Sequence, residues 1–148
     1  KNVAAQTKVG IIMWHGKCEV HERFTAKEIR EYRKDNPGIT ILAHPECSPE
    51  VVAEVDFTGS TSKMNNYVKE KQPAKVLMVT ECSMSDNVSV ENPDVQFIRP
   101  CNLCPHMKLI NLPKILESLM LNVHEVKIDQ DILEKARLPI ERMLNDYR

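Results

Sequence analysis

The sequence lacks an apolar run long enough to cross a membrane. Its apolar runs, Val9–Trp14, Ile39–Ala43 and Val76–Val79, are far shorter than the roughly 20 residues that a spanning helix needs. The chain also lacks a charge imbalance, because its formal net charge is −1 and its pI is near 6.6. No electrostatic argument therefore favours nucleic acid or an anionic membrane as a partner, and we expect neither.

A disulfide scaffold is also disfavoured. The five cysteines are odd in number and irregularly spaced, and no secretory signal is visible, although the sequence begins at Lys1 rather than Met. We therefore expect a cytoplasmic protein whose thiols bind metal or take part in redox chemistry. For Cys47 and Cys82 taken alone, ordinary packing is the preferred interpretation.

The 148 residues have the composition of one ordinary domain, or of a domain plus part of a neighbour. Short β-branched or apolar runs alternate with helical patterns along the chain. The expected strands are 9–14, 39–43, 55–58, 75–79 and 95–98, and the expected helices are 25–35, a short one from 48, 59–71, 107–121 and 129–145.

Local signals mark several helix ends. Thr25 and Glu28 have the spacing of a capping box, and Asn36-Pro37-Gly38 is a stop signal. Pro139 is expected to kink or divide the last helix. The alternation of strands and helices predicts an α/β fold, with a parallel sheet flanked by helices on both faces.

Parallel sheets of this kind bind ligands beyond the carboxyl ends of their strands. Polar candidates follow three of the expected strands: His44 and Glu46, then Thr80-Glu81, then Cys101 and Cys104. The sequences Ala43-His44-Pro45-Glu46-Cys47 and Val79-Thr80-Glu81-Cys82 also resemble each other, which points weakly to duplicated βα units.

The cysteine motifs allow more than one kind of site. Cys18-x-x-His21 has the spacing of a metal half-site, which Cys101 and Cys104 would complete as a Cys₃His zinc site. The long separation of the two halves fits an iron–sulfur cluster held between distant loops better than a compact zinc site. A redox dithiol at Cys101-x-x-Cys104 is the less favoured alternative.

His44 and Glu46 are two positions apart and would face the same side if the strand continued, which suits acid–base chemistry. The alternative is a helix start with His44 partly buried. Gly59-Ser60-Thr61-Ser62 begins a helix and has free backbone N–H groups for a phosphate or carboxylate, although ordinary capping by Ser and Thr is the commoner role of such a turn.

Taken together and in order, these motifs resemble the C-terminal half of the bacterial quinolinate synthase family. The matching segments are Trp14-x-Gly16-x-Cys18-x-Val20-His21, His44-Pro45-Glu46-Cys47, Asp56-x-x-Gly59-Ser60-Thr61, Thr80-Glu81, Cys104-Pro105-x-Met107 and Arg142-Met143-Leu144. The resemblance covers nearly the whole chain. The ordered set is specific, although each piece alone is not.

The resemblance implies a three-fold pseudo-repeat of α/β domains around one [4Fe–4S] cluster held by one cysteine per domain. It implies condensation of iminoaspartate with dihydroxyacetone phosphate to quinolinate for NAD biosynthesis, with L-aspartate oxidase as a supplier of iminoaspartate. Cys18 and Cys104 would be cluster ligands, and Cys101 a neighbouring cysteine that is not a ligand.

The resemblance also implies roles at the substrate. His21, His44 and Glu46 would orient substrate and move protons, while Ser60 and Thr61 would hold a phosphate or carboxylate. A non-catalytic iron–sulfur or zinc module using Cys18, Cys101 and Cys104 is the alternative. Whether Cys101 and Cys104 form a regulatory disulfide stays open.

The resemblance further divides the chain into three parts. Residues 1–17 would end a preceding α/β domain, 18–105 would form the third domain, and 106–148 would be C-terminal helices that pack back on the core. The family's first cluster cysteine and its N-terminal tyrosine, asparagine and histidine motifs are not among these residues. We therefore expect the N-terminal part of the same protein as a partner, and no activity from these residues alone.

Overall fold

The computed structural model describes residues 1–100 and 102–146. The chain divides into two compact units, Lys1–Lys108 and Leu109–Arg148. The predicted division into residues 1–17, 18–105 and 106–148 stays a prediction.

The first unit contains a four-stranded sheet in which every pairing is parallel. In spatial order the strands are β2 (Phe57–Thr58), β1 (Thr40–Ala43), β3 (Lys75–Val79) and β4 (Gln96–Ile98). The two central strands are apolar almost throughout because both of their faces are buried, as is usual for parallel sheets. The predicted parallel sheet is confirmed.

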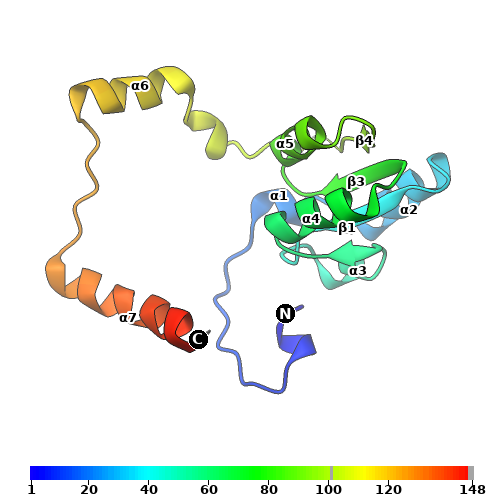
Figure 1. The fold of residues 1–148 in the computed structure, drawn as a ribbon. Coiled ribbons are helices and arrows are strands. Elements are labelled where there is room, and N and C mark those ends of the chain that lie inside the picture. Colours follow the sequence, from blue (N-terminus) through cyan, green and yellow to red (C-terminus); the bar gives the residue numbers. More distant parts are fainter. Residues whose placement is uncertain (101, 147–148) are drawn as a thin grey trace. The chain divides into compact units, whose positions relative to one another are not determined.

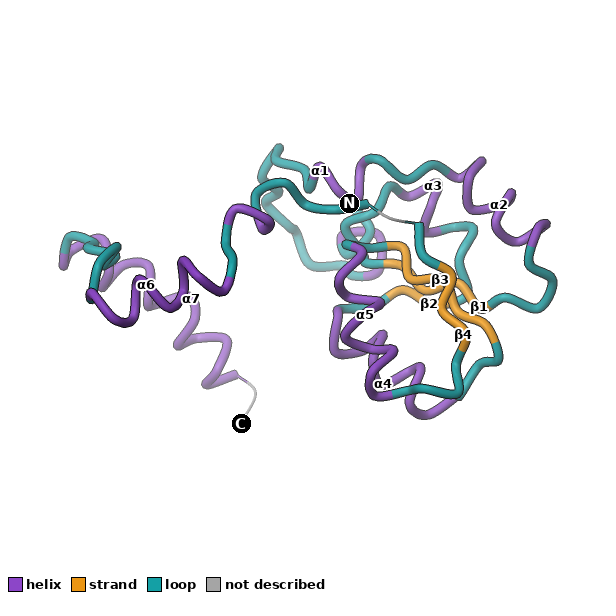
Figure 2. The backbone as a smooth tube through the Cα atoms, turned by 90° about the horizontal axis from the view of Figure 1, so that it is seen from above, coloured by secondary structure: helices purple, strands orange, loops and turns teal. Residues whose placement is uncertain are grey.

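Helices cover both faces of this sheet, as predicted (Figures 1 and 2). On one face, α1 (Glu19–Glu22), α2 (Ala26–Asp35) and α3 (Pro49–Val52) pack against Ile41 and Leu77. On the other face, α4 (Thr61–Lys71) and α5 (Cys82–Glu91) pack against Leu42 and Met78. Successive strand residues point to opposite faces, so each of the two central strands contributes to both core clusters.

The predicted helix signals act as expected. Thr25 Oγ1 accepts a hydrogen bond from the backbone N–H of Glu28 at 3.2 Å, and Glu28 Oε2 accepts one from the N–H of Thr25 at 2.9 Å. Ser48 caps α3 in a similar way. Gly38, after the end of α2, has a φ of +80°, a conformation that few residues other than glycine adopt.

The predicted strand at Val9–Trp14 is wrong. These residues have no strand geometry, and Ile12 and Trp14 are almost fully exposed. A strand needs a neighbour for its backbone hydrogen bonds, and none of the described residues supplies one here. The short 3₁₀ helix η1 (Ala4–Gln6) and helices α1 and α5 were not predicted.

The second unit consists mainly of two amphipathic helices, α6 (Leu112–Leu121) and α7 (Gln130–Asp146). The helix predicted from Met107 begins instead as the 3₁₀ helix η2 (Met107–Leu109), because Asn111 starts α6 by accepting from the N–H of Lys114 at 3.1 Å. Helix α7 continues through Pro139, so it is not divided there, and the alternative that Pro139 kinks it stays a prediction. The prediction that 106–148 pack back on the core stays a prediction.

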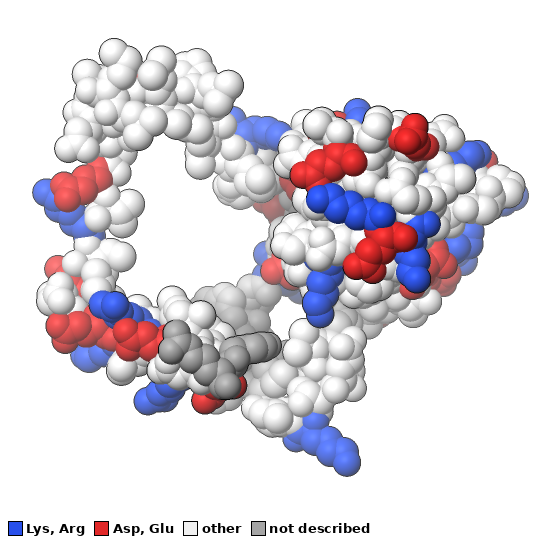
Figure 3. Space-filling view, in the orientation of Figure 1, with Lys and Arg blue, Asp and Glu red and all other residues white. Residues whose placement is uncertain are grey.

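Charged side chains of both signs are interspersed over the first unit in Figure 3, while much of α6 is uncharged in that view. The apolar side chains of α6 and α7 are exposed within their own unit. No helix within residues 1–100 and 102–146 is long and apolar enough to span a membrane.

Candidate functional site

The candidate residues of the first unit gather at one edge of the sheet. The parallel register places the carboxyl ends of the strands side by side, and backbone bonds continue beyond them. Gly59 N–H donates to the carbonyl of Ala43 at 3.1 Å, and His44 N–H donates to that of Val79 at 3.3 Å. The residues that follow β1, β2 and β3 are therefore neighbours at this edge, as Figure 2 allows the reader to follow.

His21, on α1, lies at the centre of the site. Its side chain is buried, and both ring nitrogens have partners: Nδ1 lies 3.0 Å from Glu46 Oε2, and Nε2 lies 3.1 Å from Thr80 Oγ1. A carboxylate can only accept hydrogen bonds, so Nδ1 carries the proton and donates to Glu46. Nε2 then accepts from the Thr80 hydroxyl, which fixes the tautomer of the ring.

His44 stacks on His21. The two ring centroids are 4.6 Å apart, with an angle of 7° between the planes. His44 Nδ1 accepts from the backbone N–H of Glu46 at 3.3 Å and lies 3.6 Å from Glu46 Oε2. A neutral His44 therefore carries its proton on Nε2 and has a donor to offer a ligand.

Of the two alternatives predicted for His44 and Glu46, the shared face of a continuing strand is wrong. Strand β1 ends at Ala43, so the two residues do not share a strand face. They lie on a turn that brings the Glu46 carboxylate back to both histidines. Asn2 supports this turn by donating from Nδ2 to the carbonyls of Pro45 and Cys47, at 2.9 and 2.8 Å.

The electrostatics of the site favour a neutral His21. Burial lowers its pKa most strongly, and the neighbouring His44 lowers it further, while the hydrogen bond and charge of Glu46 act in the opposite direction. The Glu46 side chain is 57% exposed, so one of the partners of this buried histidine can reach a ligand from solvent. A neutral, fixed imidazole beside an accessible carboxylate suits proton transfer.

The four described cysteines fall into two pairs. Cys47 and Cys82 are buried, and burial raises the pKa of the Cys47 thiol to about 12, so this thiol is inert at neutral pH. Cys18 and Cys104 are half-buried free thiols that pack against the same core cluster, on the face covered by α1–α3. Of the four described cysteines, only this second pair has the access that a thiolate ligand needs.

One group of metal-ligating atoms is present among the described residues. Ligand atoms of Cys18, His21 and Glu46 all lie within 4.8 Å of one another. Zinc binding there would require His21 to give up one of its two hydrogen bonds. Cys104 does not join this group within the described part of the chain, and the predictions that involve Cys101 fall outside it.

The half-buried thiols of Cys18 and Cys104 are ligands of the kind that an iron–sulfur cluster uses. Iron–sulfur clusters bind through such thiolates and need no imidazole. Cys18 and Cys104 offer two thiols that pack against one core cluster, and His21 stays available to its hydrogen-bond partners.

Ser60 and Thr61 follow β2 at the same edge and are exposed. Ser60 Oγ accepts from the N–H of Lys63 at 3.4 Å, so this hydroxyl caps α4. Gly59 is needed there, because a Cβ atom would lie 2.7 Å from the Phe57 ring and 2.9 Å from Lys63 Cβ. The turn thus combines ordinary capping with the positive end of the α4 dipole at this edge of the sheet.

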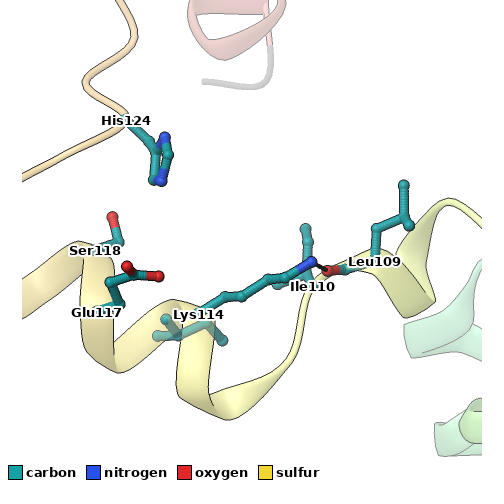
Figure 4. A pocket seen from close by; sticks show the side chains of 7 residues that line it. Leu109, Ile110, Lys114, Glu117, Ser118 and His124 are labelled. Carbon is teal, nitrogen blue, oxygen red and sulfur yellow. Dashed lines mark hydrogen bonds between the residues drawn. The ribbon is translucent and has the colours of Figure 1, made fainter.

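The choice of site residues from the sequence missed the roles of Thr80, Glu81 and Asn2. Thr80 and Glu81 were visible as polar residues at a strand end, but nothing local indicated that Thr80 contacts His21 or that Glu81 contacts Cys104. The second unit contains none of these residues. Its hollow of about 500 Å³ is lined by α6 and its flanks, where Lys114 Nζ donates to the carbonyl of Leu109 at 2.7 Å (Figure 4).

Comparison with known proteins gives one consistent result. The model of the family described as "NadA: Quinolinate synthetase A protein" matches residues 1–145. Quinolinate synthase 1 of Mesorhizobium japonicum is 63% identical over 144 residues, which are 97% of this chain and 44% of that protein. Quinolinate synthase of Agrobacterium fabrum is 59% identical over 97% of the chain and 42% of its own length.

A more distant relative shows the same coverage. Quinolinate synthase of Caulobacter vibrioides is 52% identical over 98% of this chain and 40% of its own length. The chain therefore spans about two fifths of the length of the curated relatives that it matches.

Proposed function

Because this chain belongs to the quinolinate synthetase A family, we propose that it forms part of the active site of a quinolinate synthase. The reaction condenses iminoaspartate with dihydroxyacetone phosphate, with loss of phosphate and water, and provides quinolinate for NAD biosynthesis. L-Aspartate oxidase is the proposed supplier of iminoaspartate. The observation that carries this proposal is the fixed His21–Glu46–Thr80 arrangement beside His44 and two half-buried thiols.

Cys18 and Cys104 are the residues of this chain that would hold a [4Fe–4S] cluster. When bound, the cluster supplies an iron that lacks a protein thiolate and acts as a Lewis acid toward a substrate oxygen. The half-burial of the two thiols supports this assignment, since each is partly accessible and still packs on the core.

Glu46 is the proposed proton acceptor. Its carboxylate is exposed enough to meet a substrate, and the Nδ1–H donor of His21 holds it in one orientation. His44 is the proposed donor to a substrate oxygen through Nε2–H, and stacking on His21 limits how its ring can turn. His21 itself is held on both sides, so its role is to orient Glu46 and to stabilise the carboxylate.

Ser60 and Thr61 would bind a phosphate or carboxylate of the substrates. The support is their position at the end of β2, beside the residues that follow β1, together with the backbone donors at the start of α4.

The domain assignment is part of the proposal. Residues 18–105 would form the third α/β domain of a three-fold pseudo-repeat, after the end of the preceding domain in 1–17 and before the helices of 106–148. The N-terminal part of the same protein would complete the pocket. A cytoplasmic location agrees with the free thiols of Cys18, Cys47 and Cys104.

The Glu46→Gln substitution tests this function in the full-length protein, purified without oxygen. The amide keeps the size of the side chain but cannot take up a proton, so quinolinate formation should be abolished while iron and sulfide content is unchanged. Glu50→Gln, on the exposed surface of α3, is the matched control and should keep the activity. Normal turnover by Glu46→Gln would contradict the proposed role.

The close grouping of Cys18, His21 and Glu46 favours one alternative, a non-catalytic metal module. In that case Glu46 would be a ligand, and Glu46→Gln would lower the metal content. The same substitution therefore separates the two functions.

A further inference from the structure

The backbone of Cys104 is attached to a carboxylate that the proposed reaction does not use. The N–H of Cys104 donates to Glu81 Oε1, with an N···O distance of 3.4 Å. The Glu81 side chain is only 12% exposed, and it reaches the Cys104 segment from the end of β3. A largely buried carboxylate that accepts from backbone N–H groups makes stronger hydrogen bonds than a neutral acceptor does.

The second oxygen of the same carboxylate caps a helix. Glu81 is the N-cap of α5, and its Oε2 accepts from the N–H of Ser83 at 2.8 Å. One side chain therefore links the start of α5 to the backbone of Cys104. With both oxygens directed at backbone N–H groups, Glu81 is not arranged to exchange protons with a substrate.

Two further contacts hold the same segment on either side of Cys104. Cys82 N–H donates to the carbonyl of Asn102 at 3.0 Å. Lys108 Nζ donates to Ser83 Oγ at 2.6 Å and lies 3.6 Å from Glu81 Oε1. The ammonium group of Lys108 offsets the negative charge that Glu81 places near the Cys104 segment.

We propose that Glu81 is a positioning residue for Cys104, which fixes the backbone of this cysteine so that its thiol can bind the cluster. The inference rests on the proposed function, because it takes Cys104 as a ligand. The two residues that follow β3 would then support different parts of the site. Thr80 hydrogen-bonds to His21, and Glu81 hydrogen-bonds to the backbone of Cys104. Partners that orient a ligand affect retention of the bound group even though they do not touch it.

The test separates this role from simple helix capping. Glu81→Asp keeps a carboxylate that caps α5, because Asp is a favoured N-cap, but the side chain is one carbon too short to bridge to Cys104 as well. Glu81→Ala loses both contacts. Glu91→Ala is the control, since it removes a carboxylate from the far end of the same helix, where Glu91 pairs with Lys69 and Asn65.

The measurements are made on the full-length protein purified without oxygen. They are the rate of cluster loss to a ferrous chelator, the electron paramagnetic resonance spectrum of the reduced cluster, and the melting temperature. We expect Glu81→Asp to lose its cluster about 10-fold faster than wild type, with an altered spectrum and an unchanged melting temperature. Glu81→Ala should lose it at least as fast, and Glu91→Ala should match wild type.

The inference would be overturned if Glu81→Asp lost its cluster at the wild-type rate and kept the wild-type spectrum, while only Glu81→Ala had a lower melting temperature. Glu81 would then be a helix cap and nothing more. Absence of a cluster from the wild-type protein would instead contradict the proposed function, so the two failures are distinguishable.

Discussion

His21 Nε2 lies 3.1 Å from Thr80 Oγ1, although 59 positions separate the two residues in the chain. This bond joins a short helix on one face of the sheet to the carboxyl end of the central strand β3. It leaves Nδ1 as the donor to Glu46. The end of β3 therefore determines how the exposed carboxylate of the site is held.

Replacement of Thr80 by Val tests this relationship. Valine has nearly the shape of threonine but lacks the hydroxyl, so the buried Nε2 of His21 loses its donor. We expect the free energy of unfolding to fall by about 1–3 kcal/mol, the usual cost of a buried polar atom without a partner. Urea denaturation gives this value. Thr80→Ser keeps the hydroxyl and should stay close to wild type, and equal losses in both variants would contradict the role of the bond.

The stability of the metal-free chain should depend on pH through His21. Its pKa is lowered in the folded state from the ordinary value of 6.5, chiefly by burial. The unfolded chain therefore binds this proton more readily, and the contribution of His21 to stability is complete above pH 6.5 and is lost as the pH falls through the lowered folded pKa. Denaturant unfolding of residues 1–148 between pH 7.5 and 5, with and without the His21→Gln substitution, measures this contribution to the free energy of unfolding. The same pH dependence in both chains would contradict the prediction.

Alkylation should distinguish the two pairs of cysteines. Burial raises the pKa of Cys47 to about 12, whereas Cys18 and Cys104 are partly exposed. We expect iodoacetamide at neutral pH to modify Cys18 and Cys104 in the native, metal-free chain and to spare Cys47, because only thiolates react. Mass spectrometry of tryptic peptides identifies which cysteines are alkylated. If iodoacetamide modified Cys47 as fast in the native chain as in the guanidinium-unfolded chain, the result would contradict the burial of this thiol.

Residues 1–148 by themselves should form no quinolinate. The proposed function assigns one cluster cysteine and part of the pocket to the N-terminal part of the protein, and this chain spans about two fifths of its relatives' length. The assay supplies iminoaspartate and dihydroxyacetone phosphate without oxygen, with the full-length protein as the positive control. Robust quinolinate formation by residues 1–148 alone would contradict this part of the account.

The fold was readable from the sequence where local pattern and burial agree. The β-branched runs before His44 and Thr80 form central strands because both of their faces are covered, and Thr25 and Glu28 form the predicted capping box. The same pattern failed at Val9–Trp14, where an apolar run has no neighbouring strand among the described residues. Hydrophobic periodicity indicates which face of an element would be buried, but it does not show whether a neighbouring strand is present to pair with it.

The site was readable only in part. The residue types and the strand ends identified His44 and Glu46, and the parallel sheet brings them to one edge with Ser60. The stacking of His21 on His44 depends on side chains from different segments, as does the link from Glu81 to Cys104. Such contacts are set by tertiary packing, and no local spacing contains them.

The most direct test of the whole account is the iron and acid-labile sulfide content of the full-length protein, purified without oxygen. It is measured for wild type, Cys104→Ala and Cys101→Ala. The account predicts about four irons per chain, lost in Cys104→Ala and kept in Cys101→Ala. Absence of iron, or one zinc per chain that persists in residues 1–148 alone, would contradict it and leave a zinc-binding module in place of a synthase.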